Sequence, residues 1–204
     1  MDFSGHTITQ AGFVVLTITF FGLLLKEFKI ALTKSALDHQ QKKKTFNRLL
    51  LGLVLWAALV SGWSMSGRMA DFSMFPFNVL PVLIIPLITI LIITFSKTFR
   101  EILIHVPAQN LVRLQSFRFF VEILLWVLFL QNQLPVQMTF EGRNFDVLSG
   151  LSAPIVAYLI SRQKLSRSGL IIWNILCLGL LLNILVTAIL SMPGPMRVFI
   201  NEPA

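Results

Sequence analysis

Six long apolar stretches, separated by short polar segments, constrain this chain more than any other feature. An α-helix of about 18 to 20 nearly uncharged apolar residues is long enough to cross a ~30 Å hydrocarbon core. No strand-like alternation of apolar and polar residues recurs, so a β-barrel is not expected. We therefore predict an all-α polytopic transmembrane helical bundle that forms a single integral membrane domain over residues 1–204. The six predicted spans are residues 8–25, 49–65, 78–95, 114–131, 145–161 and 170–190.

The composition agrees with a membrane protein. Hydrophobic residues make up 55% of the chain and charged residues only 13%, whereas about a quarter of a soluble domain is charged. The formal net charge of +8 could suggest a nucleic-acid partner. The basic residues lie beside the apolar stretches, however, which is typical of an orientation signal. The predicted partner is the lipid bilayer and not a nucleic acid.

The positions of the basic residues predict the orientation. Fourteen of the 17 Lys and Arg residues fall in segments 26–48, 97–118 and 162–167, and the other three are Arg68, Arg143 and Arg197. Because basic loops stay in the cytoplasm, we predict six spans with both termini outside, in the cell inner (plasma) membrane. The first half of segment 26–48 either continues the first helix over anionic headgroups or belongs to a solvated loop.

A polar stripe marks the fourth apolar stretch, which we expect to be one long helix over residues 107–131. Gln115, Arg118 and Glu122 lie at i, i+3 and i+7, and therefore on one helical face. A charge at the centre of a bilayer costs roughly 2.5–3.5 kcal/mol on insertion scales, so Glu122 should have a partner. That partner is either Arg118 on the same helix, which is close enough to the cytoplasmic face to snorkel, or a residue of another helix. Asn174 of the last span lies at a similar depth.

A second polar group belongs to the predicted outer loop 132–144 and the start of the fifth span. It consists of Glu141, Arg143, Asn144 and Asp146. In a structural interpretation, Arg143 bridges two carboxylates and folds the loop over the bundle. Asn144 is a candidate N-cap, and Asp146 in the first helical turn suits the helix dipole.

Three other features predict how the spans pack. Ser149, Ala153 and Ala157 repeat every four residues, so this small-residue face should lie tightly against a neighbour. Pro81 and Pro86 fall within the third span, where each removes a backbone donor and favours a kink packed against protein. Asn183 lies deep in the sixth span and either joins helices through a hydrogen bond or contributes to a binding site.

No motif for catalysis or cofactor binding is visible. The three histidines, His6, His39 and His105, lie outside the spans, the single Cys177 has no second cysteine, and no Gly-rich phosphate loop is present. No nucleophile–base arrangement appears either. We therefore expect no metal and no cofactor, and the sequence gives an enzyme the least support.

The run Met138–Pro154, MTFEGRNFDVLSGLSAP, together with FRFFVEILLW and PMRVFINEP, resembles an uncharacterised family of small bacterial multi-pass inner-membrane proteins. The resemblance covers most of the chain from the third span onward. It implies a further apolar, proline-containing stretch beyond Ala204, and it adds weight to the charged residues of the two polar groups. It implies no substrate.

Two functions remain open at this point. The first is small-molecule or ion transport or binding through a polar site in the bundle. The alternative is a non-catalytic membrane scaffold or an assembly subunit of a larger complex. The small size of the chain favours a homo-oligomer or a membrane-protein partner. The candidate binding residues are Gln115, Arg118, Glu122, Glu141, Arg143, Asn144, Asp146, Asn174 and Asn183.

Overall fold

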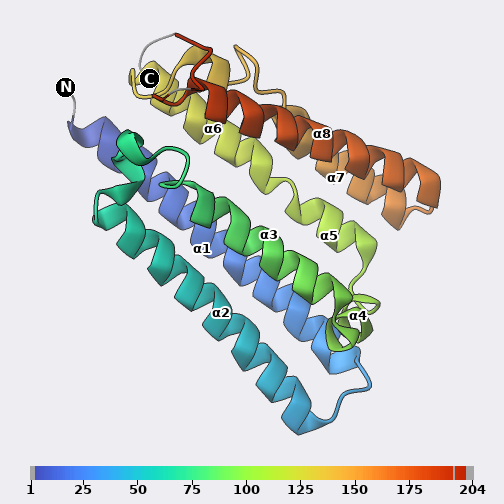
Figure 1. The fold of residues 1–204 in the computed structure, drawn as a ribbon. Helices are drawn as coiled ribbons and strands as arrows, with labels where there is room; N and C mark the ends of the chain where they lie inside the picture. The colour runs from blue at the N-terminus through green and yellow to red at the C-terminus, as the bar shows by residue number, and fades with distance from the viewer. Residues whose placement is uncertain (1–2, 195, 201–204) are drawn as a thin grey trace. The chain divides into compact units, whose positions relative to one another are not determined.

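The computed structural model describes residues 3–194 and 196–200, and the side chains of residues 7–194 and 196–200. All regular elements of these residues are helices (Figure 1), which confirms the all-α prediction. The predicted N-terminal tail and C-terminal tail lie partly outside the described residues. The elements are α1 (Phe3–Lys34), α2 (His39–Met65), η1 (Arg68–Ala70), η2 (Phe72–Met74), α3 (Leu80–Phe95), α4 (Lys97–Leu103), α5 (Ala108–Leu114), α6 (Phe117–Leu130), η3 (Val136–Met138), α7 (Val147–Ser161) and α8 (Arg167–Ser191).

Among the described residues, three helices are long and apolar enough to cross a membrane: α1 over Thr7–Lys34, α2 and α8. A fourth crossing results if α3 and α4 count as one span, although the two helices are bent by 81° at their junction. Helix α7 is apolar but shorter, with 15 residues. The chain is therefore a helical membrane protein.

The contacts divide the chain into two compact units. The first unit is Met1–Leu24 with Pro107–Ala204, and the second is Leu25–Val106. Helix α1 continues without interruption from one unit into the other. Because the contacts give two units, the single integral membrane domain over residues 1–204 stays a prediction.

In the second unit, the end of α1 packs against α2 and α4. Phe28, Ala31 and Leu32 of α1 and Ile102 of α4 form its buried core. Since α1 runs to Lys34, the first half of the basic segment 26–48 is helical. Only residues 35–38 link α1 to α2, and Asp38 caps α2 by accepting a hydrogen bond from the backbone of Gln41.

The two prolines of the third span have different positions in α3. Pro81 lies in the first turn of α3, where a helix needs no backbone donor. The expectation that Pro81 lies inside the helix is therefore wrong. Pro86 lies inside the helix, which nevertheless continues to Phe95. The large change of direction comes at Ser96, where the 81° bend leads into α4.

In the first unit, α7 packs against α5, α6 and α8. Val112 of α5 forms a buried core with Ala153, Val156 and Ala157 of α7. Ser149 is buried on the same helix, so the predicted small-residue face does lie against its neighbours. The N-terminal part of α1 completes this unit, because Phe20 contacts Phe117 of α6 with 4.5 Å between ring centroids.

The expectation of one long helix over residues 107–131 is wrong. The helix is interrupted between α5 and α6, where Gln115 and Ser116 donate to carbonyls only three residues back, at 3.0 and 3.1 Å. Such bonds tighten the chain into a 3₁₀ turn. Gly150 of α7 approaches the backbone of Phe119 here so closely that a Cβ atom on Gly150 would lie 2.2 Å from the Phe119 nitrogen. Helical periodicity in a sequence gives no signal for such a local tightening.

Candidate binding site at the start of helix α7

Arg118, Glu122 and Trp126 lie on one face of α6, because they are spaced four residues apart. Their partners come from the segment that leads into α7, in the reverse order. Arg118 pairs with Asp146, Glu122 with Asn144 and Trp126 with Glu141. The segment 139–146 therefore runs antiparallel along this face of α6. We refer to Arg118, Glu122, Asn144 and Asp146 as the Glu122 cluster.

Asn144 is at the centre of this cluster and is fully buried. Its side-chain nitrogen donates to Glu122 Oε2 at 2.6 Å and to the Met138 carbonyl at 3.1 Å. Its side-chain oxygen accepts a hydrogen bond from the Asp146 backbone nitrogen at 3.1 Å. Asn144 was expected to be the N-cap, but that position belongs to Asp146, whose side chain makes no capping bond. Asn144 thus joins α6 to the start of α7.

Arg118 and Asp146 form a largely buried ion pair, with 2.7 Å between Nη1 and Oδ1. Their side chains are only 16% and 6% exposed. Arg118 therefore does not snorkel to a surface, contrary to the expectation. Arg118 also donates to the Cys177 carbonyl of α8 at 3.5 Å. Cys177 is about 15 Å from the first residue of α8 and about 21 Å from the last, at 1.5 Å per residue. The ion pair therefore lies near the middle of a helix that is long enough to cross a membrane.

The predicted outer loop 132–144 folds back along α6 instead of extending away from the bundle. Gln137, Thr139 and Asn144 within it are buried. The ring of Phe140 lies 5.8 Å from that of Trp126. Because of this path, two residues of each predicted polar group, Arg118 and Glu122 of the first and Asn144 and Asp146 of the second, meet in one cluster. The sequence could not show this, since a polar segment between two apolar stretches is typical of an exposed loop.

Arg143 does not bridge two carboxylates, so that structural interpretation is wrong. Its guanidinium lies over the Phe199 ring, 4.8 Å from the centroid. Its carbonyl accepts a hydrogen bond from the Asn183 side chain at 2.6 Å, which joins α8 to this segment. Glu141 accepts from the Trp126 indole nitrogen at 2.7 Å, and both Glu141 and Arg143 are exposed.

Gln115 and Asn174 meet outside the Glu122 cluster. The Gln115 side-chain nitrogen lies 3.5 Å from Asn174 Oδ1, at the interruption between α5 and α6. Asn174 also donates to the Leu170 carbonyl within α8. The predicted proximity of these two residues is therefore present, as a long contact on an exposed part of the unit.

Sequence reasoning missed some residues of this site. Trp126 continues the stripe of Arg118 and Glu122 by one more turn, a signal that was in the sequence. Ser149 is 1% exposed, and its hydroxyl has no hydrogen-bond partner within the described part of the chain. The Cys177 carbonyl contributes through its backbone, for which no side-chain pattern exists.

The charges of the Glu122 cluster do not balance. It holds two carboxylates and one guanidinium, which gives a formal charge of −1 when all three are ionised. An uncompensated charge is costly in a buried site. The cluster also presents oxygen atoms from Glu122, Asp146 and Asn144, which suit a small hard cation. Among the described residues, no group of three or more His, Cys, Asp or Glu side chains could hold a metal ion.

Comparison with known proteins gives one finding. A family model described as a domain of unknown function (DUF8737) matches residues 76–200. The match includes the whole Glu122 cluster and helices α3 to α8. Searches of curated proteins and of solved structures return no match.

Proposed function

We propose that this chain, which belongs to the DUF8737 family, is a membrane transporter or binding protein that takes a small cation or a small cationic solute at the Glu122 cluster. One observation carries the proposal, namely the position of the cluster beside the middle of α8. Ionisable residues inside a membrane bundle are expensive, and they commonly mark ion and substrate pathways.

The backbone around the cluster supports this function. Arg118 of the cluster lies in the first turn of α6, just after the interruption that ends α5, and Asn144 and Asp146 lie where an irregular segment leads into α7. In many transporters, interrupted helices near the centre of the membrane form the site for the substrate and the coupling ion. Irregular backbone at that depth is tolerated only where protein or a water-filled cavity surrounds it.

The proposed topology has six crossings with both termini outside, in the inner (plasma) membrane of a bacterium. The three long apolar helices and the distribution of basic residues support it. In this arrangement, α5 and α6 together form the fourth crossing. The irregular segment and α7 together form the fifth.

A cation is the favoured ligand because of the charges in the cluster. Arg118 is already paired with Asp146, so Glu122 is the carboxylate of this cluster that has no cationic partner among the described residues. Its contact from Asn144 is a neutral amide hydrogen bond. A bound cation would balance the formal charge, whereas an anion would increase it.

Purified protein reconstituted in liposomes tests the proposal. Jumps of Na⁺, K⁺ or H⁺ concentration on a solid-supported membrane should produce a transient current, and the same cation should raise the thermal unfolding temperature in detergent. Glu122→Gln keeps the shape and removes the charge, so it should reduce both signals at least about tenfold. Asp71→Asn also removes a carboxylate charge, at an exposed position in the other unit, and should leave both signals intact. The proposal fails if the wild-type protein responds to none of these cations, or if Glu122→Gln responds like the wild type.

The alternative function, a scaffold or assembly subunit with a second copy or another membrane protein as partner, is supported by the Arg118–Asp146 pair. A buried ion pair can fix the way in which helices pack without binding a ligand. In that case, Glu122→Gln would change the unfolding temperature or complex formation, and no cation would shift either the wild type or the variant.

A further inference from the structure

A second polar feature lies in the other unit, on the first four turns of α2. Six residues of this helix line a surface hollow of about 370 Å³. They are Gln40, Lys43, Lys44, Asn47, Arg48 and Leu51. We refer to it as the α2 hollow, and it does not involve any residue of the Glu122 cluster.

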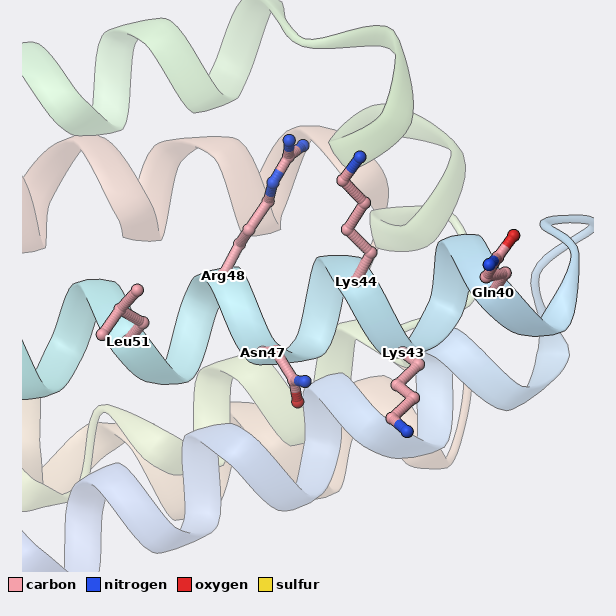
Figure 2. A pocket seen from close by; sticks show the side chains of 6 residues that line it. All are labelled: Gln40, Lys43, Lys44, Asn47, Arg48 and Leu51. Carbon is pink, nitrogen blue, oxygen red and sulfur yellow. The ribbon is translucent and has the colours of Figure 1, made fainter.

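The α2 hollow follows one stripe of the helix. Its residues recur at steps of three and four, so they lie on one face. Figure 2 shows Lys44 and Arg48 pointing to one side of this stripe, and Lys43 and Asn47 pointing to the other. The two rows flank the open α2 hollow on either side of the stripe, with cationic and amide groups at its edges.

The formal charge of the α2 hollow is positive, because its lining includes Lys43, Lys44 and Arg48 and no carboxylate. The ion pairs seen in the described part of the chain, Glu101–His105 and Arg118–Asp146, do not include its three cations. Asp38, the carboxylate nearest to the hollow in sequence, accepts from the Gln41 backbone at 2.7 Å as the helix cap. Arg and Lys together favour a phosphate group, because the planar guanidinium can bind two oxygens while the ammonium groups supply charge.

The position along α2 indicates where the phosphate comes from. The helix changes from polar to apolar at Leu49 and continues to Met65. Its 27 residues span about 40 Å, whereas a hydrocarbon core is about 30 Å thick. If Met65 reaches the far side of this core, the helix leaves the core near residue 45, so residues 39–45 lie at the level of the headgroups. Arg48 then lies about 5 Å below the boundary, from where its long side chain can snorkel to the phosphates. Leu51 lies about one turn deeper and offers an apolar contact.

We infer that the α2 hollow binds the phosphate headgroup of an anionic phospholipid in the leaflet that α2 enters. The lipid phosphate lies between the two rows of side chains, and its glycerol and first methylene groups contact Leu51. This inference rests on α2 crossing the membrane, but not on the ligand or the role of the Glu122 cluster.

The test compares lipid binding by the full chain purified in detergent. The probe is dioleoyl-phosphatidylglycerol, with dioleoyl-phosphatidylcholine as the neutral reference, and native mass spectrometry counts the lipids that stay bound. We expect the wild type to retain phosphatidylglycerol at least fivefold more tightly than phosphatidylcholine. The triple variant Lys43→Gln, Lys44→Gln and Arg48→Gln should lose this preference.

A matched variant separates a defined site from a general effect of charge. Lys97→Gln, Arg100→Gln and Lys164→Gln also removes two lysines and one arginine, all outside the α2 hollow, and it should keep the preference. Equal loss in both triple variants would overturn the inference, because it would indicate a diffuse surface field. The inference would also be overturned if the α2 triple variant kept its preference for phosphatidylglycerol.

Two further experiments test whether the phosphate belongs to a lipid and guard against misfolding of the triple variant. Glycerol-3-phosphate should not displace the lipid at concentrations up to 100-fold higher, and equal competition would indicate a soluble anion site and would overturn the lipid assignment. If the triple variant does not fold, the single variant Arg48→Gln replaces it. The expected preference is then reduced at least twofold, and an unchanged preference would count against the inference.

Discussion

Helices α3 and α7 are nearly equal in length, with 16 and 15 residues, and each contains an internal proline. Their burial differs completely. Helix α7 buries Ser149, Gly150, Ala153, Val156 and Ala157, whereas α3 buries none of its residues. The interior of α3 is a run of Leu, Ile, Val and Thr without a small-residue repeat. In a medium as apolar as the side chains themselves, small residues allow close packing, and hydrophobicity alone does not.

The difference extends to polar groups. The buried face of α7 begins beside Asp146, whose charge is paired with Arg118, and beside the buried amide of Asn144. No charged residue lies in α3. The helix that packs tightly is therefore also the one whose N-cap residue, Asp146, is a buried carboxylate. We infer that close packing is what keeps these charges away from lipid.

The largest expected effect concerns the ion pair at the start of α7. Arg118→Leu or Asp146→Leu should each destabilise the protein by about 3–5 kcal/mol, because each leaves one buried charge without its partner. Reversible unfolding in mixed micelles would measure the change. The double variant should be less destabilised than the sum of the two single variants. Strict additivity would mean that the two charges do not interact in the folded protein.

The next effect concerns the contact between Gly150 and α6. Gly150→Ala should destabilise the protein by about 3 kcal/mol, because the added Cβ would meet backbone atoms of Phe119 that cannot move freely. Gly179→Ala in α8 is the control, since nothing lies within 4 Å of a Cβ at that position. The control should be neutral, or stabilised by about 0.5–1 kcal/mol through helix propensity. If both variants melt alike, the close approach of α6 and α7 is not present.

The smallest effect compares α7 with α3 directly. Ala153→Leu should cost about 2 kcal/mol because Ala153 is fully buried against its neighbours. Thr89→Leu adds a similar side chain to the exposed surface of α3 and should change the stability by less than about 0.5 kcal/mol. The unfolding temperatures of the two variants, measured in the same detergent, check this. A larger loss for Thr89→Leu would show that α3 packs against a partner, such as a second copy of the chain.

Much of the fold could be predicted from the sequence because its signals are local. Long apolar runs identify α1, α2 and α8, and small residues at every fourth position identify the buried face of α7. Glu122 and Asp146 could be recognised as candidates because charges are rare in apolar segments. Each of these inferences depends on residues within a single apolar segment.

The assembly of the site could not be predicted in the same way. The segment that contains Asn144 is polar, and polarity indicates an exposed loop unless its partners are known. Those partners are Glu122 and Trp126, about 15 to 22 residues earlier in the chain. The turn between α5 and α6 could not be predicted for a similar reason. It occurs close to the point where Gly150 meets Phe119, and these two residues are about 31 positions apart in the sequence.

Helix α7 is about 22 Å long, shorter than a ~30 Å hydrocarbon core. As a straight helix it therefore does not cover the whole core, and the polar stretch before it has to lie within the remaining thickness. The polar stretch before it needs Glu122 and Trp126, which are synthesised earlier, and Arg118 needs the Cys177 carbonyl, which is synthesised later. The packing around Arg118 can therefore be completed only after residue 177 of α8 has been synthesised.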